Sequence, residues 1–114
     1  MKIITRADLM KMPSGTVFSY YEPCTFTGLY IKDSEPEPDY PDFNVSDLIG
    51  AIECNSHNDF STKCQQMVLG ESMPVDFESS GREGLFEDEQ LFSIYEKQDV
   101  EKLINRLASS LDNK

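Results

Sequence analysis

The chain has few basic side chains and few of the residues that catalytic and metal sites most often use. Its 114 residues include one histidine, three cysteines and no tryptophan, and ten lysines and arginines oppose 21 aspartates and glutamates. The resulting net charge of −11 repels nucleic-acid backbones and anionic membranes and attracts basic protein surfaces. The bases that exist do not cluster, so direct nucleic-acid binding is disfavoured.

Long hydrophobic runs are also missing. No apolar stretch approaches the roughly 20 residues that cross a bilayer, and the first residues lack the apolar region of a signal peptide. We therefore expect a cytoplasmic protein without a membrane segment. The sparse, odd set of cysteines, Cys24, Cys54 and Cys64, is typical of reduced thiols rather than of a disulfide framework.

No motif for catalysis, a metal or a cofactor stands out. Cys54, His57 and Cys64 form C-x2-H-x6-C, and Cys24 could add a fourth zinc ligand, but the spacing matches no established zinc motif. Small buried cysteines and a loop histidine are the favoured interpretation. An EF-hand pattern is missing, and the glycines at 81–84 are too close together for a phosphate-binding loop. We therefore predict no catalytic residue, no metal and no cofactor.

The apolar content is sufficient for a folded core. Hydrophobic residues make up 39% of the chain and aromatic residues 11%, which favours a single domain spanning 1–114. Alternating and β-branched stretches predict short strands, the first two long ones paired as a hairpin, and Thr5 is expected to cap a short helix. The predicted strands are 3–4, 16–21, 25–32, 43–53, 73–77 and 91–95, the predicted short helices 6–11 and about 60–70, and the predicted loops 55–59 and 79–84.

A C-terminal amphipathic helix is the clearest single element. Asp99 is expected to cap it, and one apolar stripe runs along it. We predict that this helix packs on one face of an antiparallel sheet, which gives an α+β fold with one or two further short helices. The same stripe leaves open a homodimer. It consists of Val100, Leu103, Ile104, Leu107 and Leu111.

Residues 33–42 differ in composition from the rest of the chain. They contain five acids, three prolines and no base, so we expect a mobile, extended acidic loop. Carboxylates at near-alternate positions could imitate a phosphate backbone on a basic partner, although acidic residues can also serve solubility alone. The predicted contact residues are Asp33, Glu35, Glu37, Asp39, Tyr40 and Asp42 in this loop, with Glu83, Glu87, Asp88 and Glu89 as a second patch.

Two stretches carry a resemblance to a known group of proteins. Residues 9–24 and 81–92, together with the helix start at Asp99, resemble small acidic accessory proteins encoded by tailed phages and prophages. The resemblance implies a setting, the cytoplasm of a bacterial host, and a role in binding host enzymes or defence complexes. It implies no catalytic residue.

Three classes of function remain after this reading. The favoured one is a non-enzymatic acidic binding protein, an inhibitor or modulator of a host protein whose basic surface could itself bind nucleic acid. The alternative is a small-ligand or metal-binding module. A virion component is disfavoured because no long self-complementary helix or repeat is present. The candidate residues of the alternative site are Tyr20, Cys24, Tyr30, His57 and Arg82.

Overall fold

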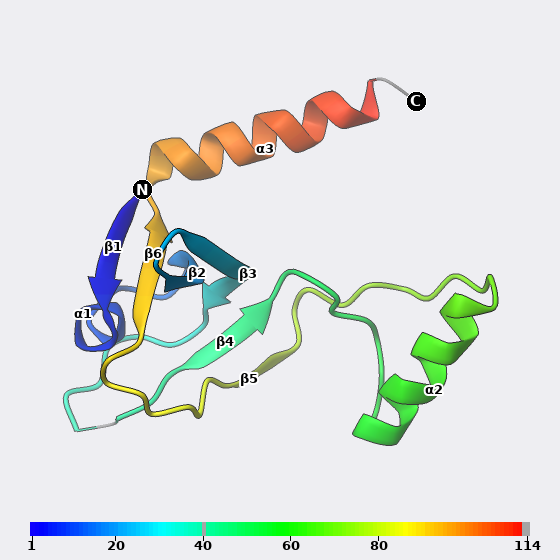
Figure 1. The fold of residues 1–114 in the computed structure, drawn as a ribbon, viewed down its shortest axis with the longest axis horizontal. Helices are drawn as coiled ribbons and strands as arrows, with labels where there is room; N and C mark the ends of the chain where they lie inside the picture. The colour runs from blue at the N-terminus through cyan, green and yellow to red at the C-terminus, as the bar shows by residue number, and fades with distance from the viewer. Residues whose placement is uncertain (40, 113–114) are drawn as a thin grey trace.

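A computed structural model describes residues 1–39 and 41–112, and Figure 1 shows the path of the chain. Strands and short helices alternate until the last helix. In chain order the elements are β1 (Lys2–Thr5), α1 (Arg6–Met10), β2 (Val17–Glu22), β3 (Thr25–Lys32), β4 (Asn44–Asp47), α2 (His57–Val68), β5 (Ser80–Arg82), β6 (Leu91–Tyr95) and α3 (Lys97–Leu111).

All six strands belong to one antiparallel sheet in the order β1-β6-β2-β3-β4-β5. The predicted hairpin is confirmed as β2 and β3. β6 comes from late in the chain and lies between β1 and β2, so that Phe92 faces Ile4 on one side and Tyr20 on the other. The sheet and the three helices form an α+β fold, as the sequence predicted.

The core is small and rich in aromatic rings. It consists of Leu9 from α1 and four residues of the sheet and its connections, Phe18, Phe43, Phe92 and Ile94. The ring of Phe18 lies 5.6 Å from that of Phe92 and 6.0 Å from that of Phe43, in edge-to-face geometry. The predicted cap of α1 is confirmed, because the Asp8 N–H donates to Thr5 Oγ1 at 3.2 Å.

A bulge in the β2–β3 hairpin brings two tyrosines together. Phe18 pairs with Tyr30, but Tyr20 pairs with Thr27, so β3 carries one extra residue between these positions. Gly28 lies in this bulge with φ +75°, and a Cβ there would collide with the Tyr30 ring. The rings of Tyr20 and Tyr30 consequently meet almost at right angles, with centroids 5.3 Å apart.

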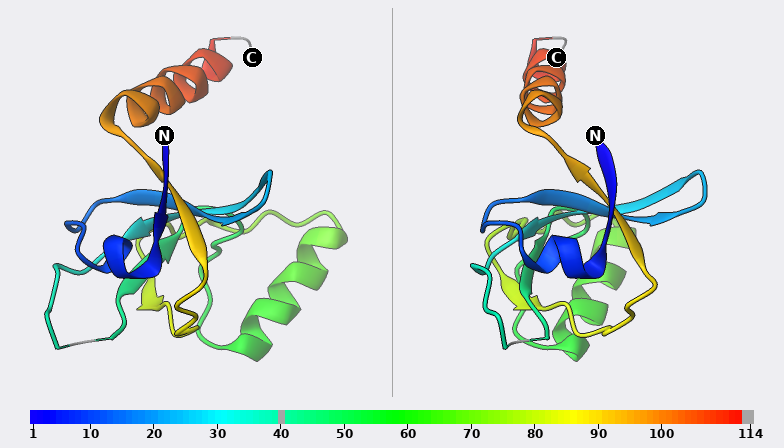
Figure 2. Two further views of the ribbon diagram at one scale, coloured as in Figure 1. Left: turned by 60° about the vertical axis from the view of Figure 1, so that its left-hand side comes forward. Right: turned by 90° about the vertical axis from the view of Figure 1, so that its left-hand side faces the viewer.

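The C-terminal helix α3 does not cover the sheet. It continues outward from the end of β6 (Figure 2), and none of its residues is buried; Ile104, Leu107 and Leu111 are 59%, 60% and 72% exposed. The prediction that its stripe packs on the sheet is therefore wrong. The physical reason is the connection, because Glu96 alone separates β6 from α3 and one residue cannot turn a helix back across the sheet.

Glu96, rather than Asp99, occupies the N-cap position of α3. Asp99 lies three residues later, where its Oδ2 accepts the Glu96 backbone N–H at 2.8 Å. Asp99 therefore closes the first turn from inside the helix, and the predicted start was three residues too late.

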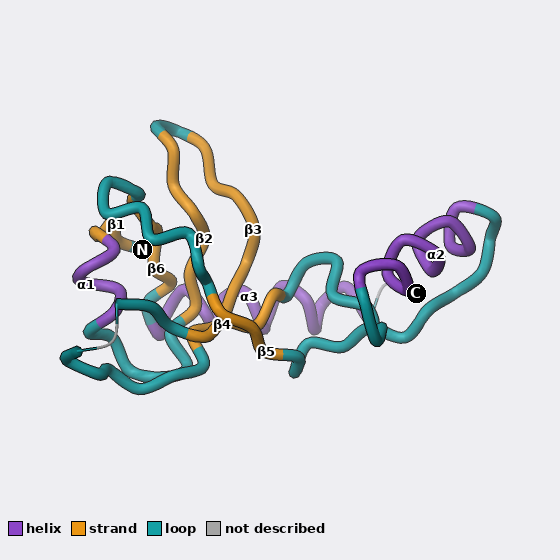
Figure 3. The backbone as a smooth tube through the Cα atoms, turned by 90° about the horizontal axis from the view of Figure 1, so that it is seen from below, coloured by secondary structure: helices purple, strands orange, loops and turns teal. Residues whose placement is uncertain are grey.

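A second element projects from the sheet between β4 and β5 (Figure 3). We call residues 49–79 the α2 arm. A single bridge between Ile52 and Val75 pairs its two connecting segments, and α2 lies at its far end with no buried residue. Ser56 caps α2 by accepting the Asp59 N–H at 3.1 Å, so the loop predicted at 55–59 is in fact the helix start.

Three further expectations differ from the structure around β4 and β5. The strand predicted at 43–53 is limited to Asn44–Asp47, and the one predicted at 73–77 is reduced to the bridge at Val75. The loop predicted at 79–84 contains β5, whose Ser-Gly-Arg sequence has no apolar alternation to reveal it. β5 forms because it pairs with β4, a contact between distant segments.

The projecting α3 and α2 arm make the molecule extended. Its radius of gyration is 15.9 Å, against about 13 Å for a compact domain of this length. Within the part of the chain described, no helix combines the length and apolarity that crossing a membrane requires.

Candidate interaction surface

A buried ion cluster joins the start of α1 to the two acidic segments of the chain. Arg6 Nη2 lies 3.2 Å from Asp42 Oδ1 and 3.0 Å from Glu83 Oε2, and it also donates to the Pro41 carbonyl at 3.2 Å. The side chains of Arg6, Asp42 and Glu83 are only 2%, 0% and 1% exposed. Solvent screens charges weakly at this depth, so the cluster holds both acidic segments against the first helix.

Asp42 is the central acceptor of this cluster. It accepts the N–H groups of Phe43 at 2.8 Å and Gly84 at 3.1 Å, and Nε of Arg82 at 3.2 Å. Burial raises the pKa of the Asp42 carboxyl, but the N–H groups of Gly84 and Phe43, with Arg82 and Arg6, outweigh it and hold that pKa below its usual value. Asp42 is therefore ionised at neutral pH.

Glu83 supplies the second buried carboxylate. It accepts the Tyr20 O–H at 3.1 Å through one oxygen and the Leu85 N–H at 3.2 Å through the other. Burial raises the pKa of Tyr20, and the neighbouring Glu83 charge raises it further. The phenol thus remains a donor to Glu83 well above neutral pH.

These contacts correct two of the predicted contact residues. Asp42 and Glu83 were expected on an exposed surface that meets a partner, but both carboxylates lie inside the protein and already have cationic and N–H partners. The sequence did not reveal this, because the cation that binds them, Arg6, lies 36 residues from Asp42 and stands in the first turn of a helix, where bases are usually solvated.

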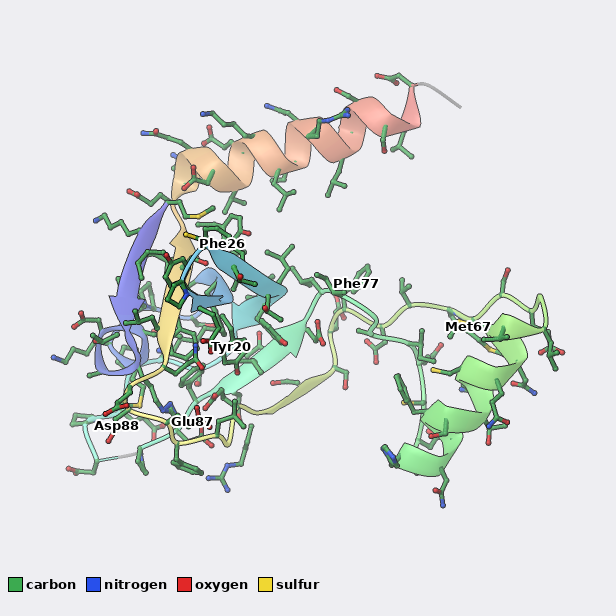
Figure 4. All side chains as sticks on the ribbon, viewed as in Figure 1. Tyr20, Phe26, Met67, Phe77, Glu87 and Asp88 are labelled. Atoms are coloured by element: carbon green, nitrogen blue, oxygen red, sulfur yellow. The ribbon has the colours of Figure 1, made fainter. Side chains whose placement is uncertain are left out.

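Apart from Asp33, which accepts a hydrogen bond from Ser46, six of the predicted carboxylates are exposed, and none of these six forms an ion pair with another described residue. Glu35, Glu37 and Asp39 lie in the loop that ends at Asp42, whose carboxylate accepts the Gly84 N–H at 3.1 Å. The other three follow Gly84 closely in the sequence. The first set lies in the connection from β3 to β4 and the second in the connection from β5 to β6, where Figure 4 labels Glu87 and Asp88. We call the set the acidic edge: Glu35, Glu37, Asp39, Glu87, Asp88 and Glu89.

The base of the acidic loop is anchored to β4. Asp33 donates its N–H to the Asn44 carbonyl and accepts the Ser46 hydroxyl, and Ser34 Oγ accepts the Asn44 N–H at 3.1 Å. Asp33 is exposed but its side chain is thus partly engaged. Tyr40, the last predicted contact residue, lies outside the described residues. With Asp42 buried at the other end, the loop is fixed at both of its ends.

Lys32, which immediately precedes the acidic loop, is turned inward. Its side chain is buried, and Nζ donates to the carbonyls of Met10 at 2.8 Å and Met12 at 2.5 Å. Burial lowers the pKa of the Lys32 ammonium, and the charge of Glu35 opposes this effect. The ammonium is thus held by backbone carbonyls and forms no ion pair with the acidic edge.

An open groove of about 490 Å³ lies on the sheet next to the ion cluster. Tyr20, Tyr30 and Arg82, three residues of the predicted small-ligand site, line it together with Val45 and Asp47. The Asp47 carboxylate pairs with no base among the described residues and accepts the Ile49 N–H at 2.7 Å. The sequence analysis did not single out Asp47. Asp47 lies two residues after Val45, and residues two apart on a strand face the same side, so this spacing could have indicated a carboxylate on the core-facing side of the strand.

The remaining residues of that alternative do not join the groove. Cys24 lies in the turn between β2 and β3, while Cys54, His57 and Cys64 lie on the α2 arm. Cys54 is exposed rather than buried as expected. In residues 1–39 and 41–112, no three histidine, cysteine or acidic side chains lie close enough together to hold a metal ion.

Comparison of this chain with protein-family models, curated proteins and solved structures gives no match.

Proposed function

We propose that this protein is a non-enzymatic binding protein that uses its acidic edge to contact the basic surface of another protein. The observation that supports it is the distribution of charge. Two cations close to the edge, Arg6 and Lys32, are held inside by Asp42 and Glu83 or by backbone carbonyls, while the six carboxylates of the edge have no ionic partner among the described residues. Exposed carboxylates without ion pairs attract a basic partner and speed its association.

A shallow cavity beside the edge could receive part of the same partner. It has a volume of about 350 Å³ and lies between α1 and the acidic loop. Ala7, Met10, Pro36 and Pro38 give it apolar walls, and Glu37 of the acidic edge and Lys11 complete its lining. An apolar stem that carries a polar or charged end group fits such a combination, because the stem packs on the apolar walls while the end group meets the charged residues.

The setting we propose comes from the resemblance to phage accessory proteins. In the cytoplasm of a bacterial host, the partner would be a host protein whose basic surface normally meets nucleic acid, and the chain would act as its inhibitor or modulator. The spacing of carboxylates along the loop supports this kind of mimicry, because an extended backbone presents side chains at regular intervals.

The test compares two variants with the same net charge. One replaces Glu35, Glu37 and Asp39 of the acidic edge with serine; the other replaces three exposed glutamates of the α2 arm, at positions 53, 71 and 78. Proteins captured from bacterial lysate are identified, and the association rate of the captured protein is measured at several salt concentrations. We expect the edge variant to associate about tenfold more slowly while its circular dichroism is unchanged, and the arm variant to behave as the wild type.

Equal loss of association in both variants would show that only total charge matters and would reject the acidic edge as the site. A captured protein whose binding strengthens with salt would reject the electrostatic basis of the proposal, because screening weakens attraction between opposite charges.

A small-ligand module is the second candidate, favoured by the groove that brings Tyr20, Tyr30 and Arg82 together. Aromatic walls with a few polar groups are typical of ligand sites. Native mass spectrometry of protein purified from bacterial cells tests it. A stoichiometric small-molecule adduct that disappears in Asp47→Asn supports this candidate, whereas a mass equal to that of the chain alone in both proteins rejects it.

A further inference from the structure

The groove beside the ion cluster is an open extension of the core side of the sheet. Residues directly opposite each other on neighbouring strands point to the same face, so Tyr30 shares its face with Asp47, its partner on β4. Val45, two residues before Asp47, packs against the core, and its partner on β5 is Gly81. These residues line the groove towards the β5 end of the sheet, whereas α1 contacts β1 and β6 at the other end.

Two tyrosines form a fixed aromatic wall of this groove, Tyr20, which Figure 4 labels, and Tyr30. Their rings meet nearly at right angles, and the Phe18 ring stacks on Tyr30 with centroids 5.4 Å apart. The Tyr20 hydroxyl is held by Glu83 at 3.1 Å. An aromatic face attracts a cation through its ring quadrupole. Because packing already holds both rings, a ligand that contacts them immobilises little that was free.

The charges around the groove leave one carboxylate uncompensated. The adjoining ion cluster is balanced, since its two arginines, Arg6 and Arg82, face two buried carboxylates. Asp47 accepts the Ile49 N–H but pairs with no base among the described residues. Burial raises the pKa of the neighbouring Tyr30 phenol, and the Asp47 charge raises it further. A group that enters the groove therefore meets neutral aromatic rings beside one negative charge.

We propose that this groove binds an arginine side chain exposed on the basic partner. The inference rests on the proposed function and adds to it the residue that anchors the partner. A guanidinium stacks on aromatic rings and pairs with a carboxylate at the same time, whereas an ammonium is a compact, strongly hydrated charge. The arginine stem packs on Val45 and the two tyrosine rings, and its planar head meets Asp47. The acidic edge then speeds the encounter, and the groove slows dissociation.

The wall of the groove nearest β5 is made of small residues, which leaves room for such a side chain. It consists of Ser79, Ser80 and Gly81. A Cβ at Gly81 would meet no atom within 4 Å, and the φ of Gly81 lies outside the left-handed region. Gly81→Val therefore places a branched side chain next to Val45, in a strand conformation that valine favours. This variant fills the space of the proposed arginine without changing any charge.

Titration of N-acetyl-arginine amide into the full chain, followed by NMR of the tyrosine rings, tests the groove directly. We expect saturable shifts of the Tyr20 and Tyr30 signals. N-acetyl-citrulline amide, whose side chain has nearly the same shape without the charge, should bind with a Kd about fivefold higher. Equal Kd values for the two amides, or no saturable shift with either, overturn the proposal.

Three variants assign the binding to the groove. Asp47→Asn and Gly81→Val should each raise the Kd of the arginine amide by about fivefold, and Asp76→Asn by less than about twofold. Asp76 is the matched control, because it also accepts the N–H two residues further on, at 3.1 Å, and does not line this groove. Unchanged circular dichroism shows that each variant is folded. A Kd that neither Asp47→Asn nor Gly81→Val raises places the amide elsewhere and overturns the site.

Kinetics with the captured protein separate this inference from the proposed function. Gly81→Val should speed its dissociation by about fivefold, whereas the acidic-edge variant slows its association. If Gly81→Val dissociates like the wild type while the acidic-edge variant still associates slowly, the proposed function stands and the arginine site fails; the reverse result rejects the acidic edge and keeps the site. A small-molecule adduct in native mass spectra that disappears in Gly81→Val assigns the groove to a free ligand and also overturns the inference.

Discussion

Replacing Asp42 with alanine removes the carboxylate that links the acidic loop, α1 and the segment after β5. The Arg6 side chain, 2% exposed, keeps only Glu83 as a counter-ion, and the N–H groups of Phe43 and Gly84 lose their acceptor. Breaking a buried ion pair by removing one partner costs about 3–5 kcal/mol. Since Glu83 still compensates part of the charge, we expect a loss of about 4 kcal/mol, to which the unpaired N–H groups contribute.

Urea unfolding followed by circular dichroism measures this loss. With an m-value of about 1.5 kcal/mol/M, the midpoint should fall by about 2.5 M with little change in m. Asp39→Ala is the matched control, because it removes an exposed carboxylate of the same loop and should change stability by no more than about 0.5 kcal/mol. If the free energy of unfolding of Asp42→Ala is within about 1 kcal/mol of the wild-type value, the view that this cluster holds the acidic edge in place is refuted.

Three further predictions concern Asp42, the bulge at Gly28 and the core residue Leu9. Because the pKa of Asp42 is depressed in the folded protein, its contribution to stability is complete above the unfolded pKa of about 3.9 and is lost as pH falls through the lower folded value. Asp42→Asn should therefore unfold in less urea than the wild type at neutral pH. Between about pH 5 and more acidic pH it should lose less stability than the wild type, measured as the urea midpoint at each pH. Gly28→Ala should lower the free energy of unfolding in urea by about 1 kcal/mol more than Gly50→Ala. Both glycines have positive φ, but only at Gly28 would a Cβ meet a ring, that of Tyr30. Equal losses in the two variants would contradict this contact. Leu9→Ala should cost about 2–5 kcal/mol, since Leu9 is fully buried in the core, and a loss below about 1 kcal/mol would show that α1 is not packed as described.

The elements that the sequence predicted correctly are those whose signals are local. Thr5 and Asp8 lie three residues apart, and their capping contact is confirmed. The β-branched and aromatic stretches around Phe18 and Tyr30 form the hairpin because a short turn joins them. Such elements need no information from distant parts of the chain.

The features that the sequence did not reveal depend on contacts between distant segments. Arg6 is buried only because Asp42 and Glu83 reach it from far along the chain. β5 exists only as a partner of β4. The periodicity of α3 correctly predicted an apolar stripe, but periodicity says nothing of what covers it; the single residue between β6 and α3 decides that.

The carboxylates of this chain occupy two different environments in the folded protein. Asp42 and Glu83 surround Arg6 in the interior, whereas the carboxylates of the acidic edge are exposed and form no ion pair with a described residue. The exposed carboxylates rather than the buried cluster therefore dominate the negative field outside this part of the protein. Added salt weakens that external field but hardly affects the buried cluster. Raising the salt concentration should therefore release the basic partner while the unfolding midpoint remains nearly constant, so one salt titration can separate the stability of the fold from the contact with the partner.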